Sequence, residues 1–303
     1  MESDNERRRP ERRQSRWPSD IPAVGWRSIL RGVARGMNRH QVSIDAAAIS
    51  FLALFAIFSA VSAFVAFYGL FADPGLVVRD MAALKGFVPA DVVISMIRQM
   101  KDVALRATPT LWGAGIFSAV VAIWCAQQGV GALMVSLNAA YRQHLEVDGW
   151  GHVFRSLALA VAVIGGLFVV SLLVIGMPVA ARVAGAQLWL AELTRIIGMV
   201  LGGLVLFFGL AALYRWVPDR DEPPRWRWVR MGAGVVVLFW TIASLLFSVF
   251  IGYSDSYTAM YGSLSGVVLL LTLTYVTVVT VLVGAEFNAQ LEAEATRQDS
   301  PDT

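Results

Sequence analysis

Charged side chains, histidine and cysteine are all scarce in this 303-residue chain. Asp, Glu, Lys and Arg together make up 16% of it, whereas about 25% is usual for a soluble domain. The one cysteine, Cys125, excludes an intramolecular disulfide and a CxxC metal site. The three histidines, His40, His144 and His152, form no HxxxH or HxH pattern. These shortages argue against disulfide-stapled and metal-dependent classes of protein.

Catalytic signatures are missing as well. The sequence has no P-loop to cradle a phosphate, no GxSxG serine and no paired-carboxylate signature. His144 is followed by Glu146 and Asp148, which could hold a cation weakly, although a solvated loop explains the same residues. We therefore expect no catalytic residues, no metal site, no cofactor and no enzymatic activity.

Long hydrophobic runs take the place of the missing charge. Hydrophobic residues make up 57% of the chain and its mean hydropathy is +0.61. A helix needs about 20 residues to cross the hydrocarbon core of a membrane. We predict an all-α polytopic membrane protein in which residues 24–290 form a single six-helix domain. Its transmembrane helices are expected at residues 46–71, 109–136, 154–180, 193–214, 230–252 and 264–288.

Arginine and lysine are distributed unevenly between the two sides of this bundle. Of the 25 basic residues, 18 fall on the side of the N-terminal arm and seven on the opposite side. The positive-inside rule then places both termini in the cytoplasm. The net charge of +3 therefore indicates topology and contact with anionic headgroups, and no nucleic-acid partner is expected. The first 44 residues contain no apolar run, so we expect no cleavable signal peptide.

Polar and amphipathic segments flank the predicted spans. Residues 1–23 form a basic arm and 291–303 a short tail, and we expect both to be disordered. A helix rich in arginine on one face is predicted after the arm, in the headgroup layer. Another amphipathic helix, over 91–106, is expected to lie either on the outer membrane surface or across the mouth of the bundle. The residues expected to anchor the chain at the interface are Trp26, Arg27, Arg31, Arg35, Trp226 and Trp228.

Small residues in spans one and six mark faces where helices can approach each other closely. In span one they recur as an alanine stripe, and in span six they are glycines. We expect helix packing at Ala53, Ala56, Ala60, Ala63, Gly262, Gly266 and Gly284.

Polar residues within or beside the spans are the candidate functional groups. They are Asp45, Gln127, Gln128, Asn138, Tyr275, Glu286 and Asn288. Intramembrane polar groups either bond across helices or line a wet pathway, and both interpretations apply here. Asp45 has a third explanation, because an acid at a helix N-terminus is favoured by the helix dipole.

Glu286 closes the last apolar run, in the stretch LVGAEFNAQLEAE. An anion near a helix C-terminus is unfavourable, so this carboxylate should have a partner. The sequence offers arginines at the inner ends of other spans. The candidates are Arg39, Arg142, Arg155, Arg215 and Arg230.

Several short blocks resemble the YihY/virulence factor BrkB family. They are DAAAISF at 45–51, SLNAAY at 136–141, YRWVP at 214–218, YGSLSGVV at 261–268 and GAEFNA at 284–289. The resemblance implies a bacterial inner-membrane protein with six spans, from a family once labelled ribonuclease BN and for which transport has been suggested. This chain departs from the family in span one, where Phe51, Ala56 and Ser59 stand in place of Tyr, Ser and Pro.

These observations favour a transport function. We expect a small anionic or lipid-like molecule to move through a polar interior formed by spans one, two and six, with the lipid bilayer and possible further copies of the chain as partners. The alternative is a structural, envelope-associated membrane protein that transports nothing. A ribonuclease is disfavoured, because the His and Asp residues of a metal cluster are missing.

Overall fold

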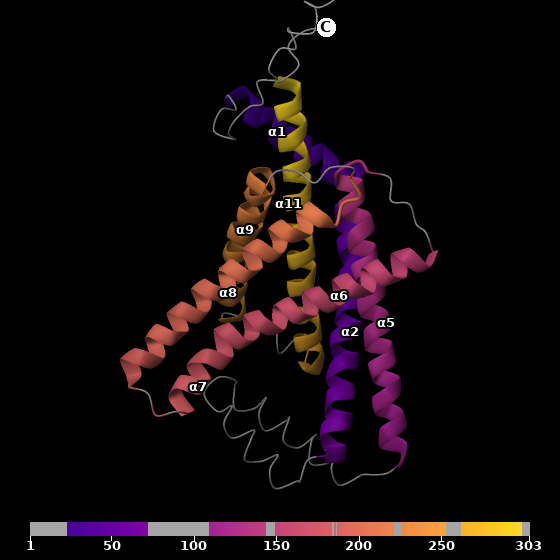
Figure 1. Ribbon diagram of the computed structural model, residues 1–303, viewed down its shortest axis with the longest axis vertical. Coiled ribbons are helices and arrows are strands. Elements are labelled where there is room, and N and C mark those ends of the chain that lie inside the picture. The colour runs from indigo at the N-terminus through magenta and orange to yellow at the C-terminus, as the bar shows by residue number, and fades with distance from the viewer. Residues whose placement is uncertain are drawn as a thin grey trace, which may run out of the picture. The chain divides into compact units, whose positions relative to one another are not determined.

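The computed structural model describes residues 23–71, 109–143, 149–183, 185, 187–220, 226–252 and 262–298. All of the regular secondary structure in these ranges is helical (Figure 1). The elements are α1 (Ala23–Arg39), α2 (Val42–Phe71), α5 (Pro109–Ala140), α6 (Gly149–Ser171), η2 (Leu172–Gly176), α7 (Met177–Val183), α8 (Leu188–Trp216), α9 (Trp226–Gly252), η3 (Gly262–Leu264) and α11 (Ser265–Gln298).

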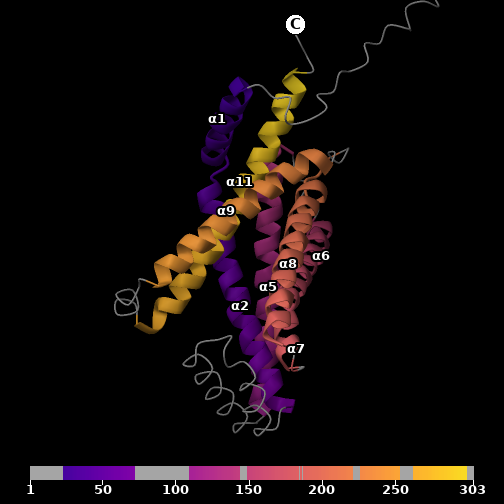
Figure 2. The ribbon, with the colours of Figure 1, turned by 90° about the vertical axis from the view of Figure 1, so that its left-hand side faces the viewer.

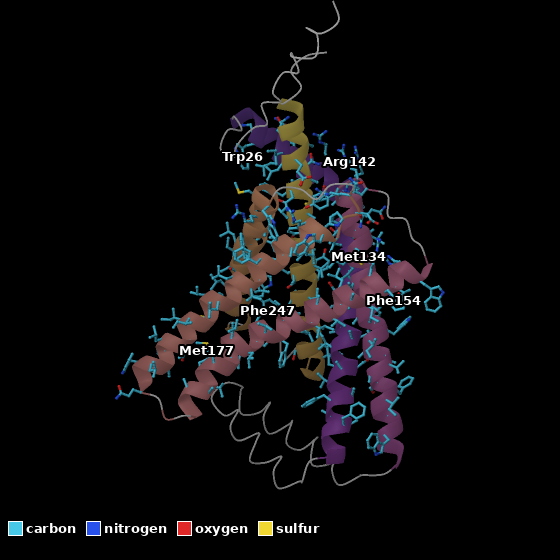
Figure 3. The ribbon with its side chains drawn as sticks, viewed as in Figure 1. Trp26, Met134, Arg142, Phe154, Met177 and Phe247 are labelled. Carbon is cyan, nitrogen blue, oxygen red and sulfur yellow. The ribbon has the colours of Figure 1, made fainter. Side chains whose placement is uncertain are left out.

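Six helical segments of the described part are long and apolar enough to cross a membrane, which confirms the predicted number. They are Val42–Phe67, Trp112–Ala140, Gly149–Ala181, Trp189–Trp216, Val229–Phe247 and Ser265–Glu294. Many of their large apolar side chains point outward, such as Phe154, which is 68% exposed and points away from the ribbons in Figure 3. Such outward apolar surface suits contact with lipid chains.

Contacts group the chain into two compact units, residues 1–49 with 130–303 and residues 50–129. The boundary falls within α2 and α5, so it does not correspond to a linker. That residues 24–290 act as one domain stays a prediction, and the helix predicted at 91–106 lies outside the described residues.

In the unit 50–129, α2 and α5 lie side by side (Figures 1 and 2). The rings of Phe67 and Trp112 meet edge to face, with centroids 6.2 Å apart. A methyl group at Gly115 would come within 3.2 Å of the Ala66 methyl, so small residues permit the close approach. In the predicted alanine stripe, Ala63 is buried and Ala60 is exposed. Ala53 and Ala56 are half-buried.

In the other unit, α11 is the helix on which its neighbours pack. It contacts α1 and α9, α9 contacts α8, and α8 contacts α6 and α7 (Figure 2). The core joins residues from five of the spanning helices, and fully buried Tyr214 lies within it. Its hydroxyl donates a hydrogen bond of 2.7 Å to the carbonyl of Val281, which ties α8 to α11.

The third span contains a widened turn, η2, between α6 and α7. Pro178 follows it by two residues and has no backbone N–H to continue the α-helical bonding. The Met177 N–H bonds the Leu172 carbonyl, five residues back, so the chain passes the proline without a break.

The C-terminal helix is longer than predicted. We expected a disordered tail from 291, but α11 continues to Gln298, so that prediction is wrong for residues 291–298. The reason is tertiary packing: Leu291 is fully buried and, with Phe287, packs against Ile29 and Val33 of α1. The apolar run alone does not reveal this, because the helix outlasts the membrane-spanning part.

Removing the Tyr214 hydroxyl tests the link between α8 and α11. We expect Tyr214→Phe to lower the free energy of unfolding by about 1 kcal/mol, the usual net worth of one hydrogen bond. Tyr275→Phe is the matched control, because within the described residues the Tyr275 hydroxyl forms no hydrogen bond. Thermal unfolding in one detergent compares them, and equal melting temperatures for the two variants would contradict the assignment.

Candidate functional site

Buried polar groups gather where the start of α2, the end of α5 and α11 meet. Asn138, Glu286 and Asn288 have at most 1% of their surface exposed, and Ser136 has 7%. They lie beside the apolar core that joins these helices to α8 and α9. Burying such groups is unfavourable unless they are bonded, so their partners define the site.

Glu286 is paired with His40. The Nδ1 atom of His40, just after the end of α1, contacts Oε1 of the fully buried carboxylate. The imidazole keeps 19% of its surface exposed, so the pair connects a buried acid to the protein surface. The other carboxylate oxygen, Oε2, has no hydrogen-bond partner within the described residues.

The predicted arginine partners of Glu286 do not pair with it in the described part of the chain. Arg39 and Arg142 are close enough for their positive charges to act on this carboxylate. In the described residues neither of them forms an ion pair with it. His40 was not among the predicted partners, which were all arginines. The available signal was the spacing of Gly32, Gly36 and His40, which places two small residues and a histidine on one face of α1.

The glycines of α1 let it lie directly on α11. A methyl group at Gly36 would collide with the Glu286 carboxylate, and one at Gly32 would collide with the Gln290 side chain. The two contacts run in opposite chain directions, so the helices are antiparallel there. Glycine at these positions therefore gives Glu286 its cover.

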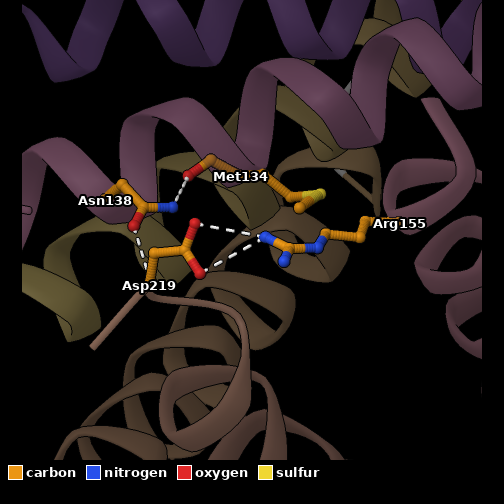
Figure 4. A network of polar contacts seen from close by, with 4 residues as sticks. All are labelled: Met134, Asn138, Arg155 and Asp219. Carbon is orange, nitrogen blue, oxygen red and sulfur yellow. Dashed lines mark hydrogen bonds and ion pairs between the residues drawn. The ribbon is translucent and has the colours of Figure 1, made fainter. Parts of the chain in front are cut away.

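The end of α5 is held by Asn138 (Figure 4). Its amide nitrogen donates to the Met134 carbonyl at 2.8 Å, and its oxygen accepts from the Asp219 N–H at 2.8 Å. Asp219 in turn pairs with Arg155 of α6 at 3.2 Å. One buried amide thus joins the end of α5 to the segment after α8.

Two further polar contacts join the spanning helices. The Ser136 hydroxyl donates to Asp45 at 2.7 Å, which links α5 to the first turn of α2. Asn288 accepts from the Gly232 N–H at 2.8 Å and donates to the Val229 carbonyl at 3.3 Å, so it links α11 to α9. Both contacts are hydrogen bonds between helices, which is one of the roles predicted for Asp45 and for Asn288.

Arg220 forms the most buried ion pair of a guanidinium in the described residues. It donates to Glu292 of α11 at 2.9 Å, and its side chain is 10% exposed. Its guanidinium also stacks 4.0 Å from the centre of the Tyr141 ring. Burial raises the pKa of Tyr141, so the phenol stays neutral and presents its ring to the cation.

A pocket of about 80 Å³ opens beside the Glu286–His40 pair, between α1, the end of α5 and α11. Figure 3 labels Arg142 and Trp26 at this end of the helices. The lining residues are Ser28, Ile29, Gly32, Arg35, Gly36, Arg39, His40, Arg142, Gln290, Ala293 and Glu294.

The other predicted polar residues lie apart from this pair. Gln127 is half-buried and Gln128 exposed, and both belong to the unit 50–129, so their place in a common interior stays a prediction. Tyr275 is half-buried and packs against the core. Within the described residues no group of three His, Cys, Asp or Glu side chains is arranged to hold a metal ion.

The predicted packing and interfacial residues are also spread over the chain. Gly284 is buried against Val236 and the Tyr214 hydroxyl, whereas Gly266 faces open space and Gly262 has a φ of +54° before α11. Trp26 packs on Phe287 with ring centroids 6.2 Å apart. Four of the predicted interfacial side chains are exposed, namely those of Arg27, Arg31, Arg35 and Trp226. The Trp228 side chain lies outside the described part. A position in the headgroup layer stays a prediction for this set.

Comparison with known proteins identifies the family. A family model described as virulence factor BrkB matches residues 33–303. The chain belongs to the BrkB virulence factor family. This confirms the resemblance seen in the sequence blocks, and with six spanning helices the chain is a multi-pass membrane protein.

Two relatives show how far the similarity extends. YfkH of Bacillus subtilis (strain 168), described as ribonuclease-like, is 30% identical over 181 residues, which are 58% of this chain and 64% of YfkH. A UPF0761 membrane protein of Tolumonas auensis is 33% identical over 133 residues, 41% of this chain and 42% of that protein. The match thus covers less than two thirds of either relative's length. No solved structure matches the chain.

A methyl group at Gly36 tests the packing that covers Glu286. We expect Gly36→Ala to lower the free energy of unfolding by about 1–3 kcal/mol, because the added carbon forces α1 away from the carboxylate. Gly203→Ala is the control: Gly203 lies within α8 with nothing near its missing side chain, so alanine should stabilise the helix by about 0.5–1 kcal/mol. The same sign in both thermal unfolding measurements would show that α1 does not pack as described.

Proposed function

We propose that this BrkB-family protein moves a small anionic or lipid-like molecule across the bacterial inner membrane, without enzymatic chemistry. One observation carries the proposal: a fully buried carboxylate on a spanning helix, Glu286, is connected to the surface through the partly exposed His40. Ionisable groups inside spanning helices are costly and mark transport pathways and proton relays.

The surroundings of the pair support movement of a solute. Buried polar groups from spans two and six, including Asn138 and Asn288, lie beside the same core, where half-buried Asp45 of span one accepts a hydrogen bond from Ser136. Arginines flank the opening, which favours an anion over a cation. Oε2 of Glu286 has no hydrogen-bond partner in the described part of the chain, so it is an acceptor that a proton can use.

The direction of insertion follows from the distribution of basic residues. The side of the N-terminal arm carries 18 of the 25 arginines and lysines, so His40 and the pocket lie at the cytoplasmic face in this proposal. Both termini are then cytoplasmic. In this orientation the headgroups of anionic lipids lie within reach of α1. The exposed apolar faces of the helices also leave room for contacts between several copies of the chain.

A structural role is the second candidate, and the hydrogen bonds of Asn288 favour it. Asn288 bonds α11 to α9 through both its amide oxygen and its amide nitrogen, as interhelical clamps do, and Glu292 of α11 pairs with Arg220 in the segment after α8. If Glu286 were another clamp, its replacement would change stability and nothing else.

Glu286→Gln separates the two functions, because it removes the charge and keeps the shape. We expect proteoliposomes with the unaltered protein to move radiolabelled phosphate or a fluorescent phosphatidic acid. Glu286→Gln should slow that movement at least about tenfold, as expected when a pathway carboxylate worth about 1.4 kcal/mol or more is lost.

Glu192→Gln is the matched control, since the Glu192 side chain is 57% exposed on α8 and pairs with Arg195, three residues on. It should leave the rate within about twofold of the unaltered protein, given the small worth of exposed pairs. Equal rates for Glu286→Gln and Glu192→Gln would remove the transport role of Glu286. A lowered melting temperature for Glu286→Gln with no flux in any sample would support the structural role.

A further inference from the structure

The pocket beside Glu286 is large enough for a small anion. Its volume of about 80 Å³ is several times the roughly 10–15 Å³ that one water needs. Gly32 and Gly36 are among its lining residues, and His40 forms part of the same wall. The pocket therefore combines room with hydrogen-bond donors.

Positive charge dominates the opening. The guanidinium groups of Arg35, Arg39 and Arg142 outnumber the Glu294 carboxylate at the rim and the Glu286 carboxylate beneath it. Within the described residues, Arg39 and Arg142 form no ion pair closer than 4.0 Å. Arg35 donates through Nε to the Arg31 carbonyl at 3.3 Å, and among the described residues its other guanidinium nitrogens form no ion pair. Several donors are thus left to bind an external group.

Arg142 occupies its position at a conformational cost. Its φ is +56°, in the left-handed region that favours glycine. The Gln143 N–H bonds the Asn138 carbonyl at 2.9 Å and the Arg142 N–H bonds Ala139 at 3.0 Å, which is the helix ending where glycine is the usual residue. The fold would be better served by glycine, so the arginine at this wall indicates a role for its side chain.

We infer that this pocket binds a phosphate group, held by Arg39 and Arg142 with Arg35 at the rim. Arginine suits phosphate because its fixed fork of donors matches the oxygens of the anion. The guanidinium groups come from two elements, α1 and the end of α5, so they approach from different directions. That arrangement matches a tetrahedral group with several charged oxygens more closely than a planar carboxylate.

The inference rests on the proposed function, since it names the chemical class of the molecule that would be moved. The same phosphate chemistry is offered by free inorganic phosphate and by the headgroup of an anionic phospholipid. The pocket opens at the expected headgroup level, where both are present.

Binding to the purified protein at low ionic strength tests the site directly. The two probes are inorganic phosphate, titrated in neutral detergent, and mixed micelles containing phosphatidic acid, compared with micelles containing phosphatidylcholine alone. We expect saturable binding of at least one phosphate probe, observed by phosphorus NMR and by a rise in melting temperature. Binding of inorganic phosphate identifies the free anion as sufficient, and binding of phosphatidic acid alone identifies the lipid headgroup.

Arg39→Gln should weaken that binding at least about tenfold, because a hydrogen bond to a charged group is worth that much. Arg31→Gln is the matched control: Arg31 is an exposed arginine on the same helix, two turns earlier and outside the pocket lining. It should change the affinity by less than about twofold, given the small worth of exposed charges.

Arg142→Gly distinguishes binding from folding, because glycine suits the left-handed backbone. We expect an unchanged or higher melting temperature together with at least about tenfold weaker binding. The inference is overturned if neither probe binds saturably, or if Arg39→Gln and Arg142→Gly bind as tightly as Arg31→Gln. Phosphate binding without flux in proteoliposomes would contradict the transport function and support the phosphate site. Flux without saturable phosphate binding would contradict the phosphate site and support the transport function.

Discussion

The burial of Glu286 is the constraint on which the rest of this site depends. The carboxylate is fully enclosed on α11, and an enclosed acid needs a partner and a cover. Helix α1 supplies both, with His40 as partner and Gly36 as the close-packed cover. The same packing buries Leu291 and carries the arginines of α1 to the pocket. A single antiparallel helix contact therefore creates the pair, the pocket and the extended end of α11.

The sequence correctly indicated that Glu286 needs a partner, but for the wrong physical reason. The argument relied on the unfavourable dipole at a helix C-terminus, whose effect fades within the last turn. Since α11 continues to Gln298, Glu286 lies three turns from that end, and burial alone creates the demand. The partner is a histidine because the arginines nearby keep their charged groups in water, where hydration favours them. His40 follows the end of α1 and contacts the carboxylate that packs against Gly36.

The length and composition of the apolar runs were sufficient to predict the spanning helices, because each helix must supply an apolar surface long enough for the bilayer. They were not sufficient for the contacts between helices. Which helix covers Glu286 depends on residues 246 positions apart in the sequence, and Asn138 meets Asp219 across a separation of 81. Periodicity does not report such pairings. The Gly32, Gly36 and His40 spacing is the local signal that comes closest, since it marks a face suited to close packing with a titratable group at its end.

Polar cross-links are concentrated near the end of the helices that holds this site. The Ser136–Asp45 bond joins two helices there, and the Asn138–Asp219 and Arg220–Glu292 contacts each join a helix to the segment after α8. Farther along α11, the Trp240–Thr277 bond is a lone polar contact to α9 among the described residues. Helices joined by hydrogen bonds separate less readily than helices that pack through apolar side chains alone in a lipid environment. Within the described residues, separating α11 from its neighbours therefore meets its greatest resistance around Glu286, where hydrogen bonds and ion pairs add to the apolar packing.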